Sequence, residues 1–240
     1  MVNNRLINNK MNQNIAIIPA RGGSKRIPKK NIIDFCGKPM IAWTIEAAIK
    51  SDMFSKILVS TDCEEIANVS RDFGAEVPFL RKSFKDDNSP VSMATLNALE
   101  DAKNYWDLDF DCVTQLMPNC PLRNEKDIVS AVNIFKDDKR DLQISCFKFD
   151  WMNPWWAFKF KDQDSHEFMF PDAIKKRSQD LEDLFCPTGS IWIAKSEKLR
   201  NTNSFYGKGH KFEPINWISA VDIDNYEDLH FAKALKDIDN

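Results

Sequence analysis

The sequence lacks any apolar run that approaches the roughly 20 residues needed to span a bilayer, so no transmembrane segment is expected. Its first thirteen residues (MVNNRLINNKMNQ) are rich in Asn and contain no apolar stretch of the kind found in signal peptides. Net charge is also nearly absent, because 33 Lys and Arg residues are balanced by 36 Asp and Glu residues, which leaves −3. This balance argues against binding to nucleic acid or to anionic membranes through bulk charge. We therefore expect a cytoplasmic protein with no nucleic-acid partner and no membrane partner.

Clustered metal-binding side chains are missing too. The 3 histidines are isolated, and the 6 cysteines are widely scattered, with no CxxC pair and no neighbouring histidine. Neither a zinc site nor a disulfide framework is expected from this pattern. We expect reduced thiols, and nothing in the sequence supports a catalytic Cys–His pair.

The chain does contain enough apolar surface for a substantial core. Hydrophobic residues make up 43% of its 240 residues and include 17 Phe and 7 Trp, which excludes disorder as the dominant state. Short apolar strands alternate with segments of helical period. The strands are expected at 15–18, 56–60, 76–80 and 111–116, and the helices at 41–49, from Asp62 with Glu65 as a capping-box partner, at 91–106 and at 125–135. The alternation predicts an α/β fold, a parallel sheet with helices on both faces, in which Pro78 places its strand at an edge.

This alternation breaks near residue 150, after an expected strand at 143–149. Trp155, Ala157 and Lys159 alternate with the aromatic residues at 156, 158 and 160, which predicts an exposed β-hairpin arm. The aromatic side chains need burial, and we favour contact with a second subunit, with the lining of a pocket as the alternative.

The core pattern resumes after the arm. It returns at 189–194 and 217–223, and a final helix is expected at 226–235. We predict a flexible tail at 1–13 and a single domain at 14–240 that carries an aromatic β-arm around 150–184.

The segment after the first expected strand, PARGGSKRIPKKN at 19–31, has the composition of a phosphate-binding loop. Two adjacent glycines allow backbone amides to approach a ligand, and five cations fall within ten residues. In a doubly wound sheet, ligands bind beyond the carboxyl ends of the strands, where this loop would lie. The loop suits a triphosphate, although it matches neither the Walker pattern nor GxGxxG. A solvated basic turn is the alternative.

These residues also carry a resemblance. The run IAIIPARGGSKRIPKKNI, followed by GKPMIAWTIEAA, ILVSTD, PLR, RSQDL, PTGSIWI and VDIDNYEDL, closely resembles the bacterial acylneuraminate cytidylyltransferases, the CMP–sialic acid synthetases. The resemblance covers nearly everything after residue 13. It implies a Rossmann-like, three-layer nucleotidyltransferase fold and a homodimer joined through the protruding arm. It also implies magnesium-dependent transfer of CMP from CTP to a nonulosonic (sialic-acid-like) sugar acid, giving a CMP-sugar for surface glycoconjugates such as lipopolysaccharide or capsule.

The resemblance also implies roles for individual residues. Arg21 and Lys30 would stabilise charge on the transferring phosphate and on the pyrophosphate leaving group, and Asp222 and Asp224 complete the catalytic set. Lys29 is expected to face water. The implied nucleotide-binding residues are Ala20, Arg21, Gly22, Gly23, Ser24, Lys25, Lys30, Asn31, Arg81 and Asp87. For Arg81, a surface arginine at a strand end is the alternative.

Asp222 and Asp224 stand two apart at an expected strand end, where a period of two points both carboxylates the same way. Magnesium is usually held by one or two carboxylates together with substrate phosphates. The alternative is structural, because Asp224 with Glu227 also fits a helix capping box. Since the phosphate loop is present and the family's DID-type metal motif is matched here, we favour Mg²⁺ as the cofactor of both carboxylates.

The sequence departs from the sialate-type pattern where the acceptor would be recognised. Sialate-type members typically carry Gln-Pro-Thr-Ser-Pro-Leu-Arg, and here Met117 replaces the glutamine that contacts sugar or base. The segment WMNPWW at 151–156 likewise replaces a typically basic stretch. The remaining sugar-binding candidates are Gln115, Asn119, Arg177 and Gln179, and an exposed charged loop is the alternative for the last two. We therefore expect a nonulosonic acid other than sialic acid.

Two other functions stay open. One is a different sugar nucleotidyltransferase, of Kdo type or using another nucleoside triphosphate. The other is a non-catalytic nucleotide-binding subunit, against which the intact Asp222, Asp224 and Arg21 argue. The sequence does not identify the group that accepts the proton of the attacking hydroxyl.

Overall fold

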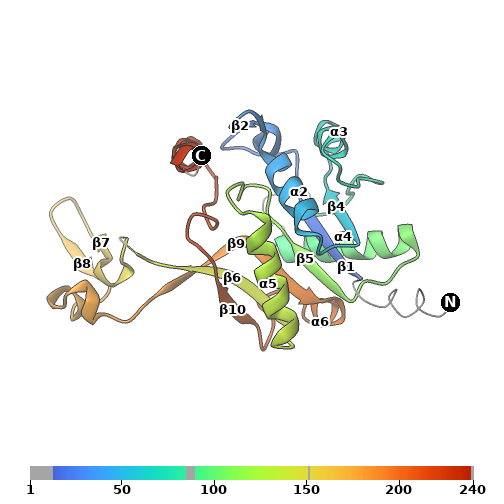
Figure 1. Ribbon diagram of the computed structural model, residues 1–240. Helices are drawn as coiled ribbons and strands as arrows, with labels where there is room; N and C mark the ends of the chain where they lie inside the picture. The colour runs from blue at the N-terminus through green and yellow to red at the C-terminus, as the bar shows by residue number, and fades with distance from the viewer. Residues whose placement is uncertain (1–12, 85–89, 151, 239–240) are drawn as a thin grey trace.

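A six-stranded sheet forms the centre of the molecule (Figure 1). The computed structural model describes residues 13–84, 90–150 and 152–238, so the expected tail lies outside the described residues except for Gln13. The strands are β1 (Asn14–Pro19), β4 (Lys56–Ser60), β5 (Cys112–Gln115), β6 (Leu142–Lys148), β9 (Phe185–Lys195) and β10 (Lys211–Pro214). Their spatial order is β10-β6-β9-β5-β1-β4, and β9 alone runs antiparallel to its neighbours in this described sheet. The expected mostly parallel α/β sheet is confirmed.

Helices cover both faces of the sheet, and β1 shows why its sequence is wholly apolar. Ile15 and Ile17 point to one face, while Ala16 and Ile18 point to the other, and all four are fully buried. The first face is covered by α4 (Val91–Trp106) and α6 (Ser196–Thr202). The second is covered by α2 (Met40–Ser51), α3 (Glu64–Asp72) and α5 (Glu125–Asp137). The fold is therefore the predicted three-layer arrangement.

A third, smaller core holds the C-terminal helix α7 (Tyr226–Ile238) against the body. Leu229 and Ala232 pack with Phe35 and Met40, beside the short hairpin of β2 (Asp34–Phe35) and β3 (Lys38–Pro39). This packing brings the end of the chain to the carboxyl edge of the sheet, next to the loop after β1.

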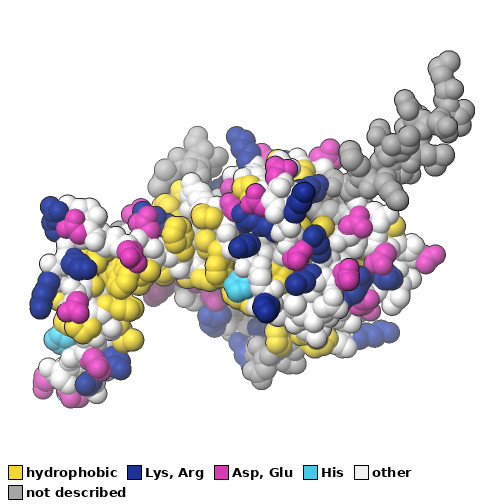
Figure 2. All heavy atoms as spheres, turned by 90° about the horizontal axis from the view of Figure 1, so that it is seen from below, with side chains coloured by type: hydrophobic (Ala, Val, Ile, Leu, Met, Phe, Trp, Pro, Cys, Tyr) yellow, Lys and Arg dark blue, Asp and Glu magenta, His cyan; other side chains and the backbone are white. Residues whose placement is uncertain are grey.

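The segment between β6 and β9 forms the arm, which projects from the body in Figure 1. Its tip is an antiparallel hairpin of β7 (Phe158–Phe160) and β8 (His166–Phe168), so the predicted β-hairpin is confirmed. Short 3-10 turns complete it: η3 (Pro154–Trp156), η4 (Ala173–Lys175) and η5 (Ser178–Asp180). Phe160 is 74% exposed, and hydrophobic side chains gather on the arm and on the adjoining body in Figure 2.

Two expected strands are wrong. Residues 76–80 make only one isolated parallel bridge, Leu58 to Glu76, so the segment lies at the sheet edge beyond β4 without forming a strand. Pro78, which has no backbone N–H to donate, is consistent with this early end. Residues 217–223 form a turn and an irregular segment instead of a strand. At the opposite edge of the sheet from β4 lies β10, which was not expected because its charged, exposed sequence shows no apolar pattern.

The capping box expected at Asp62 and Glu65 is wrong, and the alternative box at Asp224 and Glu227 does not form either. Helix α3 begins after Cys63, and the Asp62 carboxylate accepts a hydrogen bond from the Gly22 amide at 2.8 Å. At α7, the Asn225 side chain accepts from the Asp228 amide at 2.9 Å, and the Asp228 carboxylate accepts from the Asn225 amide at 3.0 Å. The box at α7 is thus formed one residue later than the Asp224–Glu227 alternative.

Among the described residues, none of the helices combines the length and apolar character needed to cross a membrane. All six cysteines are free thiols.

Candidate active site

The loop after β1 is fixed by contacts to its neighbours. The Gly22 amide donates to Asp62 as described above, and a Cβ at Gly22 would lie only 2.9 Å from the Cβ of Cys63, so a larger residue would displace the loop. The Asn31 side chain donates to the Arg21 carbonyl at 3.0 Å and closes the loop. Lys29 adopts a left-handed conformation with φ of 55° and pairs with Glu65 at 2.8 Å. The predicted nucleotide loop is thus held in one shape, with Lys29 turned away from the loop interior.

Asp224 faces the loop and binds two of its cations. Lys30 Nζ lies 2.8 Å from Asp224 Oδ1 and also donates to the Ile223 carbonyl at 2.9 Å. Arg26 lies 2.8 Å from Asp224 Oδ2. These contacts join residues almost two hundred positions apart and place carboxylate and cations side by side.

Asp222 is positioned by Asn119, which follows β5. The Asn119 side chain donates to Asp222 Oδ1, and the Asn119 carbonyl accepts from the Ile223 amide at 2.9 Å. The loop after β5 therefore aligns the segment that carries both carboxylates.

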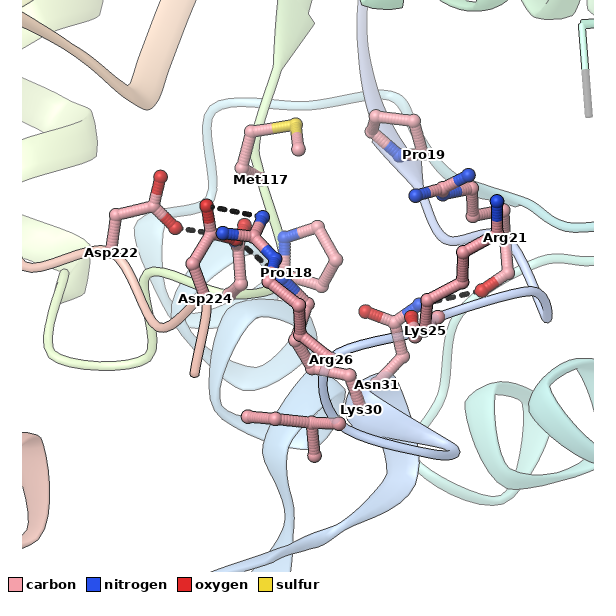
Figure 3. Close-up of a pocket in the computed structure, with 13 residues that line it drawn as sticks. Pro19, Arg21, Lys25, Arg26, Lys30, Asn31, Met117, Pro118, Asp222 and Asp224 are labelled. Carbon is pink, nitrogen blue, oxygen red and sulfur yellow. Dashed lines mark hydrogen bonds and ion pairs between the residues drawn. The ribbon is translucent and has the colours of Figure 1, made fainter. Parts of the chain in front are cut away.

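The cations and carboxylates line one cavity of about 290 Å³ (Figure 3). In this close-up, Asp222 and Asp224 lie on one side, Arg21 and Lys25 on the other, and Arg26 and Lys30 come from below between them. The predicted residues in its lining are Arg21, Ser24, Lys25, Lys30, Asn31, Asn119, Asp222 and Asp224. The cavity thus presents both charge signs to a single ligand.

The two carboxylates have different electrostatic environments. The pKa of Asp222 rises to about 6, first because the cavity wall partly desolvates the carboxylate and disfavours its charge, and then because Asp224 is a neighbouring negative charge. The residue as a whole is solvent-exposed. Burial acts in the same direction at Asp224. There the hydrogen bond and charge of Lys30, followed by those of Arg26, outweigh it and hold the pKa below its ordinary value.

The donor set fits magnesium shared with substrate phosphates. In the described part of the chain, no group of three or more His, Cys, Asp or Glu side chains could enclose a metal by itself. Asp222 keeps one carboxylate oxygen beyond its contact with Asn119, and the buried Asn119 Oδ1 has no hydrogen-bond partner. Carboxylate and amide oxygens are hard donors, and Mg²⁺ commonly takes only one or two carboxylates. Both oxygens of Asp224 hold cations here, so Asp222 is the more available of the pair.

Several predicted residues lie outside this cavity. Arg81 is 4% exposed, its amide donates to the Thr61 carbonyl at 2.7 Å, and burial lowers the pKa of its guanidinium. Its alternative as a surface arginine is wrong. Ala20, Gly22 and Gly23 belong to the loop but not to the lining. Asp87 lies outside the described residues.

The sugar-binding candidates are spread over three places. Gln115 is fully buried in β5 and accepts a hydrogen bond from Thr95 at 2.6 Å, so its side chain is part of the core. Asn119 lines the cavity. Arg177 and Gln179 lie in the exposed arm, where Arg177 pairs with Asp180 at 2.7 Å. Of these four residues, only Asn119 lines the cavity described above, which we call the basic cavity because the cations of the loop after β1 line it.

Sequence reasoning missed three residues that build the site. Arg26 belonged to the recognised cation run, but its pairing with Asp224 depends on the fold. Asp62 was read as a cap rather than as the acceptor for Gly22. Arg123 is fully buried and donates to the Ser190 carbonyl at 2.7 Å and to the Thr44 hydroxyl at 2.6 Å, so it ties the loop after β5 to β9 and α2.

The fold and this cavity together define an α/β nucleotidyltransferase. The sequence matches the family model described as Cytidylyltransferase over residues 15–237. It is 36% identical to pseudaminic acid cytidylyltransferase of Campylobacter jejuni, covering 93% of this chain and 96% of that protein. It is 35% identical to CMP-N,N'-diacetyllegionaminic acid synthase of Legionella pneumophila, with the same shares covered. The chain therefore belongs to the cytidylyltransferase family.

A solved structure supports the fold independently. CMP:2-keto-3-deoxy-manno-octonic acid synthetase, complexed with CTP, superimposes with a TM-score of 0.68 over 95% of this chain and 99% of that one, at 16% identity. At this identity the likeness concerns the fold alone.

Proposed function

We propose that this enzyme transfers CMP from CTP to the anomeric hydroxyl of a nonulosonic sugar acid and releases pyrophosphate. The observation that carries the proposal is the single cavity that joins the basic loop to Asp222 and Asp224. The acceptor class is supported by the two relatives described above, which are named for pseudaminic acid and for the CMP derivative of N,N'-diacetyllegionaminic acid. The CMP-sugar formed would supply surface glycoconjugates, and we expect the reaction to take place in the cytoplasm.

The basic loop would bind the triphosphate and stabilise its leaving group. Arg21, Lys25 and Lys30 present charged donors to the cavity, where negative charge grows on the β- and γ-phosphates as the bond to the α-phosphorus breaks. Lys30 is well placed for this because Asp224 and the Ile223 carbonyl hold its ammonium. The rigid loop thereby orients the α-phosphorus for in-line attack by the acceptor hydroxyl.

Asp222 and Asp224 would hold magnesium. Bound there, the ion would neutralise phosphate charge and polarise the α-phosphorus. Asn119 keeps the Asp222 carboxylate turned into the cavity through its amide donor.

We also propose that the enzyme is a homodimer joined through its arm. Support comes from the exposed apolar side chains of the hairpin, which a lone chain leaves in contact with water.

The test is pyrophosphate release from each of the four nucleoside triphosphates, with magnesium and with a panel of nonulosonic acids and Kdo. We expect release with CTP and a nonulosonic acid, and a product with the mass of the CMP-sugar. Asp222→Asn should lose this activity, and Tyr105→Ala, an exposed side chain on α4, should keep it.

Other outcomes separate the alternatives. Release without preference for CTP contradicts the cytidylyl assignment, and preference for Kdo contradicts the acceptor class. CTP binding without release for any acceptor would favour a nucleotide-binding subunit.

A further inference from the structure

The backbone just before Asp222 is held by side chains of β9. This part of the chain is a turn followed by an irregular stretch, yet Ser219 and Ala220 are only 5% and 4% exposed. Buried carbonyls need hydrogen-bond donors, and outside a strand these must come from side chains or from the turn itself. The Ser190 hydroxyl donates to the Ser219 carbonyl at 3.0 Å, and the Thr188 hydroxyl donates to the Ala220 carbonyl at 3.1 Å.

An irregularity in β9 lies at these two hydroxyls. The pairing of β6 with β9 is regular up to Ile144 and Trp192, and it resumes at Cys146 and Pro187. One residue of β6 therefore faces a longer stretch of β9, the stretch that carries both hydroxyls. Bulges of this kind re-aim side chains relative to the regular alternation of a strand. The bulge is thus the place where β9 bonds to the segment before Asp222.

Arg123 joins the same bulge to the loop after β5. Its guanidinium is fully buried and donates to the Ser190 carbonyl at 2.7 Å and to the Met117 carbonyl at 3.2 Å. Burial lowers its pKa to about 10, and a buried charge held by neutral acceptors is costly to desolvate. Met117 lies in the wall of the basic cavity (Figure 3) and begins the loop whose Asn119 binds Asp222. One buried side chain therefore connects the two structures that hold this carboxylate.

We infer that Arg123 and Ser190 are positioning residues, which fix the backbone around Asp222 so that its carboxylate faces the triphosphate. Neither residue lines the basic cavity, so both act through Asp222 and not on the substrate. The inference rests on the proposed function, in which this carboxylate would hold magnesium. Residues that orient a metal ligand typically change metal affinity or activity by 10- to 100-fold when they are replaced.

The test compares two buried serines. Ser190→Ala removes the hydroxyl that holds the Ser219 carbonyl, and Ser70→Ala removes an equally buried hydroxyl, on α3, that donates to the Ile66 carbonyl at 2.7 Å. We expect Ser190→Ala to lower kcat for pyrophosphate release by about 10- to 100-fold, with KM for CTP within about twofold of the wild type. Affinity for Mn²⁺, a paramagnetic substitute for Mg²⁺ measured by EPR with CTP present, should fall by about 10-fold.

Ser70→Ala should keep the wild-type kcat and Mn²⁺ affinity. The melting temperature should fall by about 2–4 °C in both variants, because each loses one buried hydrogen bond. Stability alone therefore does not separate the two serines, whereas kcat and metal affinity do.

Arg123→Lys provides a second variant. Lysine keeps the charge but lacks the planar fork that reaches two carbonyls at once. We expect the same pattern as in Ser190→Ala, with a kcat loss of about 100-fold. Binding of CTP without metal, measured by calorimetry, should be unchanged in both variants, because the loop after β1 is held by its own contacts to Asp62 and Asn31.

Other results overturn the inference. Wild-type kcat and Mn²⁺ affinity in Ser190→Ala would show that its hydroxyl serves stability only. A fall in metal-free CTP affinity as large as the fall in Mn²⁺ affinity would show that the whole cavity is disturbed, not the position of one carboxylate. If the wild type releases no pyrophosphate with any acceptor, the proposed function falls, and the Mn²⁺ affinities of the two serine variants still decide whether Ser190 positions Asp222.

Discussion

Individual charges in the basic cavity are paired across the molecule rather than along the sequence. Asp224 binds Arg26 and Lys30, whereas Lys29, the residue between these two cations, pairs with Glu65 on α3. The local sequence identifies the run of cations, but it does not show which acidic residue each of them binds. Which cation faces the carboxylates is decided by the left-handed turn at Lys29, a feature that no composition reveals.

This difference gives a matched test of adjacent lysines. Lys30→Gln should lower kcat/KM for CTP by about 10²- to 10³-fold, because the leaving group loses a positioned charge. Steady-state pyrophosphate release measures the effect. Lys29→Gln removes the same charge from the same loop but only an exposed ion pair, so its activity should stay within about threefold of the wild type. Equal losses in both variants would mean that the loop acts only through its total charge.

At the scale of elements, apolar pattern predicted the buried parts well and the exposed parts poorly. The strands β1, β4, β5, β6 and β9 were all anticipated, because their side chains are enclosed by helices on both faces. The exposed strand β10 was not predicted. The segment at 217–223 was predicted as a strand from its apolar residues, but these residues form a turn and part of a cavity wall. An apolar sequence pattern indicates that a segment is buried, but it does not distinguish a buried strand from a buried irregular loop.

Near the start of helix α7, the carboxylate that faces the cavity and the carboxylate that caps the helix belong to different residues, Asp224 and Asp228. Asp228 accepts hydrogen bonds from the amides of Asp224 and Asn225 at 2.9 and 3.0 Å. Asp228→Ala should therefore reduce the free energy of unfolding by about 1–2 kcal/mol in urea titrations. Asp224→Asn should change it by only a few tenths of a kcal/mol, since its ion pairs are partly exposed, while abolishing pyrophosphate release. A large loss of stability in Asp224→Asn would instead assign that residue a structural role.

At the scale of the whole molecule, the near-zero net charge conceals a separation of polar and apolar surfaces. The basic loop and carboxylates meet at one edge of the sheet, and the aromatic residues gather on the arm and at its base. The aromatic run predicted a hairpin correctly because alternation is a local property. Its binding partner is not local, so the second subunit remains a prediction.

The hairpin itself supplies a test of that subunit. Phe158 and Phe160 share one face of β7 with the rings of His166 and Phe168, while Lys159 points to the other face and pairs with Glu167 at 3.2 Å. We expect the wild type to be a dimer by size-exclusion chromatography with light scattering, and Phe158→Ser/Phe160→Ser to be a monomer, because the apolar surface that drives association is lost. Lys159→Ser should remain a dimer. CTP binding should persist in all three proteins, since the basic cavity lies entirely in the body. A monomeric wild type, or a double variant that stays dimeric, would contradict association through the arm.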